Sequence, residues 1–378
     1  MTIPAAASAA SRTRFLSLDV LRGATILLMI LVNTPGPGAP SYAQLTHAHW
    51  FGLTLADLVF PTFLFVTGNA LAFAPPITEE SVFLRRVGKR SALIFLCGVL
   101  MYWYPFVQQV DGDWVFKPFA QTRLLGVLQR IALCYLLAAL AVRYLPTRLL
   151  PWLALALPLA YWAILWIFGP PGQPLDKLGN AGTRLDLWLL GPAHLYRKDG
   201  GFDPEGLLGT LPATANVLAG YLAGVWLRHA GKTARAAGWM LACGALLVVC
   251  ALLWAPLFPI AKKLWTGPFV LLTVGLDLLL LAALVVWLEV RGHRAGTGVF
   301  TVLGKNPLAI YLFSELLVVT LQLVRVAPGQ GLYDWIGVNL FQRLAPGAFG
   351  SLLCAVAYTA VCWLLAWWMD RRRWYIRL

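Results

Sequence analysis

The segment His47–Asn69, HAHWFGLTLADLVFPTFLFVTGN, combines an apolar run of membrane-spanning length with side chains that could do chemistry. His47, His49 and Trp50 come just before the run, at the depth where amphipathic rings settle in a bilayer interface. Asp57 lies about one helical turn inside it. Ionisable groups in a span are costly and usually face a cavity or a partner, so Asp57 is a candidate site residue. The alternative is a hydrogen bond at a helix end or between helices.

Asn33 closes the first apolar segment, because the Pro- and Gly-rich TPGPGAPSY that follows cannot continue a helix. We expect Asn33 and His47 to lie at the same depth and to converge. An imidazole there would act as a base, and an amide would orient it or donate to a developing oxyanion. We therefore predict a catalytic group of His47, Asn33 and Asp57, with no metal.

Cationic residues lie inside or beside other apolar segments. Arg22 follows Asp19 by three residues on one helical face, which is compatible with a local ion pair. Arg130 and Lys305, the latter beside Asn306, add two more cations. Such residues would bind the phosphates of a cofactor within the bundle. The alternative is neutralisation by carboxylates of the same bundle, namely Asp19, Asp277 and Glu315.

The elements that must position these residues are membrane helices. The chain has 378 residues, of which 60% are hydrophobic and 12% charged, and its mean hydropathy is +0.72. This composition predicts an all-α polytopic membrane protein. About ten segments have the length to cross the hydrocarbon core. They are residues 16–34, 53–74, 91–106, 122–142, 149–168, 207–227, 236–256, 267–289, 298–323 and 349–369.

The positive charge is distributed unevenly between the two sides of this topology. One side carries 17 Lys and Arg residues and the other 10, so the first is predicted to be cytoplasmic. Both termini then lie in the cytoplasm, and the loop of His47 faces the periplasm. The basic residues form short clusters between apolar runs, which does not indicate a nucleic-acid partner. All six cysteines fall in apolar runs without a CxxC pattern, so we predict neither a disulfide nor a metal site.

The domain organisation is predicted to be simple: one transmembrane domain over residues 1–378. Residues 1–15 form a cytoplasmic tail that leads into an uncleaved signal anchor, and residues 370–378 form a basic cytoplasmic tail. The loop 169–206 is long enough to fold over a site as a lid or to act as a structural cap.

The sequence contains no GxSxG, HExxH or P-loop motif, which removes the usual support for a hydrolase or an ATPase. A cationic inner half and an outer histidine suit the transfer of a group across the membrane. A transporter of an amino sugar or N-acetylglucosamine is the main rival, although we find no internal repeat of the kind transporters show.

Six blocks of the sequence resemble the heparan-alpha-glucosaminide N-acetyltransferase family of transmembrane acyltransferases. They are LDVLRG, LMILVN, the segment from His47 to Asn69, LLGVLQR, FDPEGLLGT and GKNPLAIYLFSE. The resemblance implies a dimeric enzyme that takes acetyl-CoA from the cytoplasm and acetylates a terminal glucosamine on the far side. The family's catalytic histidine, asparagine and aspartate fall on His47, Asn33 and Asp57. A serine of the family motif is replaced by His49.

The chain lacks the luminal domain of the animal enzyme, so the resemblance implies a bacterial member in the inner membrane. The CoA phosphates are expected at Arg22, Arg130, Lys305 and Asn306. His47 is either a base in a ternary complex or a nucleophile in a ping-pong cycle. An O-acetyltransferase of an envelope polysaccharide is a second rival. The residues predicted to bind substrate are His49, Trp50, Asp203, Glu205 and Glu315.

Overall fold

Long helices make up most of the chain in the computed structural model, which describes residues 14–110 and 113–376. The longer helices are α1 (Leu16–Asn33), α2 (Leu55–Ala72), α3 (Glu80–Trp103), α4 (Val127–Tyr144), α5 (Leu150–Phe168), α6 (Ala181–Leu190), α7 (Thr210–Ala230), α8 (Ala234–Trp254), α9 (Gly267–Leu284), α10 (Thr297–Lys305), α11 (Pro307–Leu323) and α14 (Ala348–Arg371). Two short helices, α12 (Leu332–Ile336) and α13 (Gln342–Leu344), precede α14.

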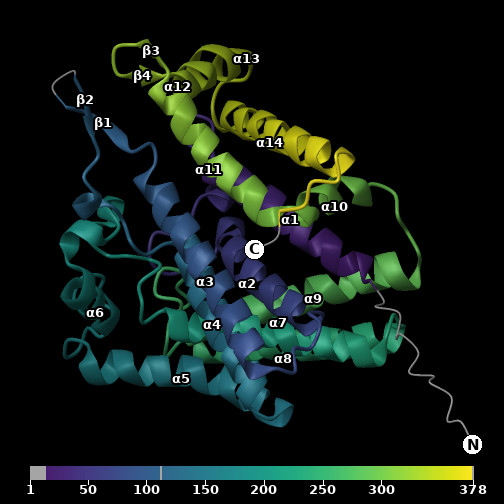
Figure 1. The fold of residues 1–378 in the computed structure, drawn as a ribbon. Helices are drawn as coiled ribbons and strands as arrows, with labels where there is room; N and C mark the ends of the chain where they lie inside the picture. The colour runs from purple at the N-terminus through teal and green to yellow at the C-terminus, as the bar shows by residue number, and fades with distance from the viewer. Residues whose placement is uncertain (1–13, 111–112, 377–378) are drawn as a thin grey trace, which may run out of the picture.

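Two small antiparallel hairpins contain the described strands. One joins β1 (Val107–Val110) to β2 (Asp113–Phe116), and the other joins β3 (Arg325–Ala327) to β4 (Gln330–Gly331). Both stand at one end of the molecule in Figure 1, away from the packed helices.

The prediction of an all-α polytopic membrane protein is confirmed. Among the described residues, seven helices are long and apolar enough to cross a membrane, and the pair α10–α11, bent by 86°, makes an eighth if it counts as one span. Each of the ten predicted segments falls on helix. Two of the ten predicted segments, in α3 and α7, are not among these eight spans. Their helices contain more polar residues than a membrane-spanning helix by this measure.

The helix α3 begins eleven residues before the predicted segment 91–106, at Glu80. The hydropathy of the N-terminal half of α3 is lowered by four cationic residues, Arg85, Arg86, Lys89 and Arg90. Such residues do not disfavour a helix, so the helix begins earlier than hydropathy indicates. The helix ends at Trp103, two residues before Pro105, which cannot continue it. The third predicted span is thus the end of a longer, partly cationic helix.

The helices α2 and α7 pack backbone to backbone near the middle of the bundle in Figure 1. A Cβ atom on Gly68 would overlap the carbonyl oxygen of Val217, and one on Gly220 would overlap that of Phe65. Small residues at a helix crossing allow such an approach in membrane proteins. The glycines therefore set the position of α2, the helix that carries Asp57.

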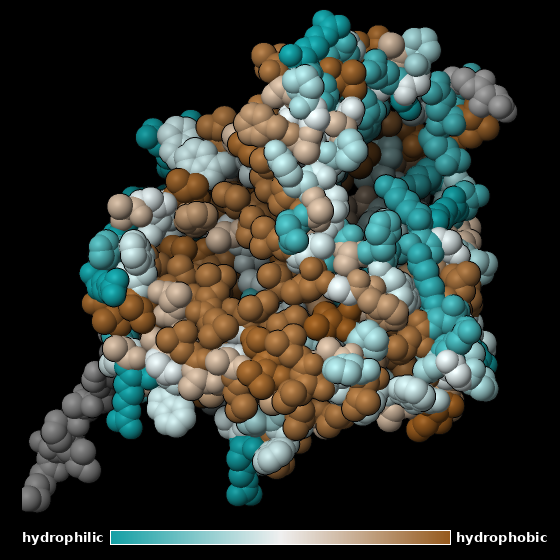
Figure 2. All heavy atoms as spheres, turned by 180° about the vertical axis from the view of Figure 1, so that it is seen from behind, coloured by the Kyte–Doolittle hydropathy of each residue, from teal (hydrophilic) through white to brown (hydrophobic). Residues whose placement is uncertain are grey.

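The exterior is broadly apolar, as Figure 2 shows for the back of the molecule, where hydrophilic residues gather at the edges of a wide hydrophobic area. Large exposed side chains of α5 and α8 include Trp152, Trp166, Leu246 and Leu253. These surfaces suit contact with lipid tails.

The two described chain ends lie together, because Arg14 and Tyr375 line the same cavity. The predicted tail 1–15 falls almost entirely outside the described residues, as do the last two residues of the tail 370–378.

Candidate active site

Asp57 is buried at the third position of α2 and binds groups on two sides. Its Oδ1 lies 2.9 Å from His47 Nδ1, and its Oδ2 accepts from the backbone nitrogens of Ala48, at 3.1 Å, and Thr54, at 3.0 Å. The Thr54 hydroxyl oxygen also lies 3.0 Å from Oδ2, although its single hydrogen has a closer acceptor in Thr46 O, at 2.7 Å. An ionised carboxylate only accepts, so Nδ1 carries the proton and Nε2 keeps its lone pair. Asp57 therefore both caps the helix and orients the imidazole. The sequence offers a helix-end hydrogen bond and a role as a site residue as alternatives, and the structure combines them.

The loop that carries His47 is fixed by backbone contacts. Gly52 N donates to Ile260 O at 2.8 Å, and Gly52 forms a parallel bridge with Ala261. The φ of Gly52 is +110°, a conformation that L side chains rarely adopt. The Thr54 hydroxyl also donates to Thr46 O at 2.7 Å. These contacts tie the histidine loop to the segment between α8 and α9.

That segment brings Lys262 to the imidazole. Its Nζ lies 3.0 Å from His47 Nδ1, 3.1 Å from His47 Nε2 and 3.7 Å from Asp57 Oδ1. Burial lowers the pKa of Lys262, and the nearby carboxylates of Asp57 and Glu205 oppose this only in part. Sequence reasoning placed Lys262 only among the cations of an outer loop, and no motif pointed to it.

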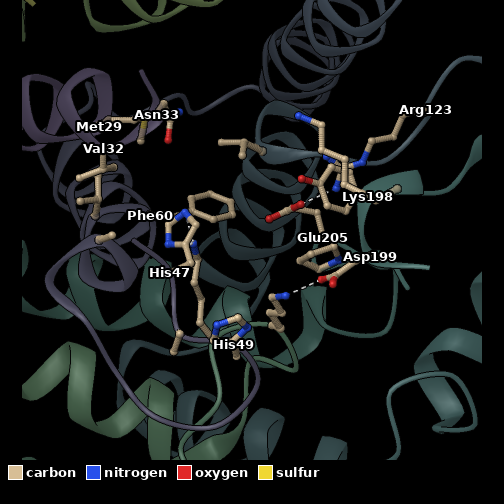
Figure 3. Close-up of a pocket in the computed structure, with 18 residues that line it drawn as sticks. Met29, Val32, Asn33, His47, His49, Phe60, Arg123, Lys198, Asp199 and Glu205 are labelled. Carbon is tan, nitrogen blue, oxygen red and sulfur yellow. Dashed lines mark hydrogen bonds and ion pairs between the residues drawn. The ribbon is translucent and has the colours of Figure 1, made fainter. Parts of the chain in front are cut away.

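His47 faces a cavity of about 340 Å³, which Asn33 and His49 also line. Figure 3 shows His47 beside Phe60, with Arg123 and Glu205 across the cavity. Asn33 Nδ2 donates to Glu315 Oε1 at 3.0 Å. The structure thus brings Asn33 and His47 to one cavity, but within the described part of the chain the amide binds Glu315 instead of the imidazole.

Arg123 organises the opposite wall. Its Nη2 lies 2.5 Å from both Asp203 Oδ1 and Glu205 Oε2, and its guanidinium stacks on the ring of Tyr196 at 4.5 Å. Burial would raise the pKa of Glu205, but Arg123 and other nearby cations lower it below its ordinary value. A carboxylate therefore faces the cavity in ionised form.

Three predicted substrate-binding residues, Asp203, Trp50 and Glu315, do not line this cavity themselves. Asp203 is buried behind Arg123 and accepts from Tyr196 N at 3.1 Å, so it supports the wall. Trp50 packs edge-on against Phe202, with 4.9 Å between ring centroids. His49 and Glu205 do line the cavity, and Glu315 reaches it through Asn33.

The loop 169–206 supplies part of the wall through Tyr196, Lys198, Asp199 and Glu205. Asp199 binds Lys177, and its Oδ2 lies 2.5 Å from Lys263 Nζ. Burial opposes ionisation of Asp199, yet the two lysines hold its pKa below the usual value. These ion pairs fasten the loop to the segment that carries Lys262.

A second cavity, of about 630 Å³, lies at the other end of α1 and is rich in cations. Arg22 Nη1 lies 3.7 Å from Asp19 Oδ1, and Lys305 Nζ lies 2.7 Å from both oxygens of Asp370. Arg90 stacks on the ring of Tyr135 at 4.7 Å and has no ion pair with a described residue. Arg90 is therefore a cation in this cavity without an ion pair to a described residue. In the sequence, Arg90 enters only the charge count that predicts membrane orientation.

Two predicted cofactor-binding residues lie elsewhere. Arg130 is buried where α4 packs on α7, where it donates to Gly206 O at 2.7 Å and stacks on Trp265 at 5.1 Å. Asn306 donates to Trp374 O at 2.8 Å and accepts from Ile376 N at 2.9 Å, so it anchors the C-terminal segment. Neither side chain lines the second cavity, although Lys305 does.

The two cavities approach each other closely along α2 and α4. On α4, Val127 lines the first cavity and Leu128 the second. On α2, Phe60 lines the first and Phe63 the second, which corresponds to about 4.5 Å of helix. Apolar residues within one turn of α2 and α4 therefore lie between a histidine site and a cationic site.

Comparison with known proteins places this chain in a family. The model of the heparan-alpha-glucosaminide N-acetyltransferase catalytic region matches residues 14–252. The chain is 27% identical to the heparan-alpha-glucosaminide N-acetyltransferase of Mus musculus over 366 residues and to that of Homo sapiens over 361 residues. These alignments cover 81% and 80% of the chain but 54% and 53% of the relatives. Since the family model matches more than half of its length, the chain belongs to the heparan-alpha-glucosaminide N-acetyltransferase catalytic family.

Proposed function

We propose that this protein is a membrane acetyltransferase that moves the acetyl group of acetyl-CoA to the amine of glucosamine or of a glucosamine-terminated sugar. One observation carries the proposal: a cavity with an aspartate-oriented histidine and a cavity with a cationic lining lie on either side of apolar residues of α2 and α4. Family membership supplies the reaction class.

The cationic cavity suits the phosphates of CoA. Arg22, Arg90 and Lys305 offer the donors that phosphate oxygens accept, and the volume of about 630 Å³ suits a large ligand. The thioester arm would run toward the apolar residues Phe63 and Leu128. With the charge asymmetry of the loops, this cavity opens to the cytoplasm and the His47 cavity to the periplasm. We extend the proposal to an inner-membrane homodimer through the family resemblance.

The reaction needs positioning and proton transfer, because a thioester is already activated. His47 Nε2 would accept a proton from the attacking amine, while Asp57 holds the tautomer. The amine nitrogen forms a bond to the acetyl carbon, and the sulfur leaves with the electron pair of the broken C–S bond and takes up the proton. A ping-pong cycle, in which His47 carries the acetyl group, stays open. The ionised Glu205 is suited to hold an acceptor ammonium.

The test is acetyl transfer from radiolabelled acetyl-CoA in proteoliposomes, with unmodified protein and with His47→Ala. We expect labelled N-acetylglucosamine from glucosamine with the unmodified protein only, and no labelled product when N-acetylglucosamine is the acceptor. His47→Ala should still bind acetyl-CoA, since His47 does not line the cationic cavity that would hold the phosphates. Product from N-acetylglucosamine would favour the O-acetyltransferase. In a parallel assay with radiolabelled glucosamine, accumulation of the unacetylated sugar inside the liposomes without acetyl transfer would refute the proposal in favour of a transporter.

A further inference from the structure

We propose that Lys262 is a further catalytic residue, whose ammonium donates to the oxygen of the thioester carbonyl as negative charge develops there. The inference rests on the acetyl transfer proposed above. It starts from one geometric fact: Lys262 Nζ lies 3.0 and 3.1 Å from the two ring nitrogens of His47. A carbonyl carbon attacked by a group that gives its proton to Nε2 lies beside the imidazole, where this ammonium is the neighbouring cation.

Lys262 is held in place by its backbone and is not a mobile surface lysine. Its carbonyl accepts from Trp265 N at 2.9 Å, and the preceding Ala261 N donates to Thr266 Oγ1 at 3.1 Å. The carbonyl of Leu264 accepts from the Tyr161 hydroxyl at 2.7 Å. The side chain is 13% exposed. A donor fixed in this way needs little reorganisation when charge appears, which is the condition for strong transition-state stabilisation.

A purely structural ion pair with Asp57 explains the lysine less well. The carboxylate of Asp57 already has three donors, namely His47 Nδ1, Ala48 N and Thr54 N. The Lys262 ammonium lies 3.7 Å from it, beyond hydrogen-bond distance. Lys262 also lines the cavity, so its remaining hydrogens have room to meet a ligand.

The step balances as follows. The amine nitrogen forms a bond to the acetyl carbon, the π electrons of the C=O bond move to oxygen, and the amine proton passes to His47 Nε2. Lys262 keeps its own protons and donates a hydrogen bond to the oxyanion. When the C=O bond re-forms, the C–S bond breaks, and the thiolate takes the proton from His47.

The test compares Lys262→Met and Lys262→Arg with Lys89→Met, which removes an exposed lysine of α3. We expect Lys262→Met to lower kcat by about 10²- to 10³-fold, as for loss of an oxyanion donor, with little change in KM for acetyl-CoA. Lys262→Arg should retain more activity, because it keeps the charge. Lys89→Met should match the unmodified protein.

A second donor distinguishes direct oxyanion contact from mere support of His47. The fluorine of fluoroacetyl-CoA stabilises the same oxyanion by induction, so Lys262→Met should lose less activity with it than with acetyl-CoA. An equal loss of activity with both acyl donors would overturn the proposal. A kcat of Lys262→Met within threefold of that of the unmodified protein would also overturn it, as would loss of the folded state in both Lys262 variants. Absence of transfer by the unmodified protein would refute the proposed function itself.

Discussion

Asp57→Asn probes the hydrogen bond that sets the tautomer of His47. Two backbone donors, Ala48 N and Thr54 N, converge on Oδ2, whereas Oδ1 has its hydrogen bond with His47 Nδ1. An asparagine would therefore keep its carbonyl oxygen at the Oδ2 position. Its NH₂ group would then face His47 Nδ1 and donate to it, which moves the imidazole proton to Nε2 and removes the basic lone pair from the cavity.

The size of the effect follows from this geometry. Reversal of an imidazole tautomer in an otherwise intact site costs about 10⁴-fold in kcat in a serine protease, so we expect a loss of about 10³- to 10⁴-fold here. Stability should change far less, because the donors to Oδ2 keep an acceptor and the His47 contact, which is only partly buried, costs about 1 kcal/mol. Asp57→Ala would instead leave three donors without a partner.

The assay is single-turnover acetyl transfer together with thermal unfolding in detergent, and Asp113→Asn on the exposed β1–β2 hairpin is the matched control. A value of kcat for Asp57→Asn within threefold of the unmodified protein would show that the tautomer of His47 does not matter. A collapse of the melting temperature in parallel with activity would instead assign Asp57 to capping of α2.

Three further predictions follow from the same structure. Arg90→Gln should raise the Kd for acetyl-CoA by about tenfold with kcat unchanged, because it removes a cation without an ion pair to a described residue. Arg85→Gln, on the exposed side of α3, should leave the Kd unchanged, and titration calorimetry would measure both values. The pKa of Asp199 is lowered in the folded protein, so the ionised carboxylate stabilises the fold above the unfolded pKa of about 3.9. This stabilisation is lost as the pH falls through the folded pKa. The difference in melting temperature between the unmodified protein and Asp199→Asn should therefore shrink from pH 6 to pH 3. Gly68→Ala should destabilise the protein by about 1 to 3 kcal/mol in thermal unfolding, since its Cβ would overlap a carbonyl of α7, while Gly238→Ala, which meets no atom within 4 Å, should be neutral or slightly stabilising.

The membrane fold was predictable because hydrophobic length is a local property of the sequence. The boundaries of α3 were not, since Arg85 and Arg86 belong to a helix that hydropathy alone truncates. Proximity of Asp57 to His47 was partly predictable, because a capping residue at the start of α2 lies near the loop before it.

Contacts between distant segments were beyond the sequence. Lys262 reaches His47 only because the segment between α8 and α9 pairs with Gly52. Arg130 was assigned to phosphate by residue type, but its face of α4 turns toward α7. Residue type showed which chemistry was available, whereas helix rotation and loop pairing decided where it is used.

The apolar layer between the cavities bears on how the membrane voltage acts on the protein. Water in each cavity would carry the potential of its own compartment to the layer of Phe60 and Phe63, so most of the voltage would fall across that layer. A full charge moved through it would exchange about 2.3 kcal/mol per 100 mV. In the proposed reaction an acetyl group would cross as a neutral thioester, while the phosphates would stay with Arg22 and Lys305. Delivery of the group would then do no electrical work, and the energy would come from the thioester bond alone.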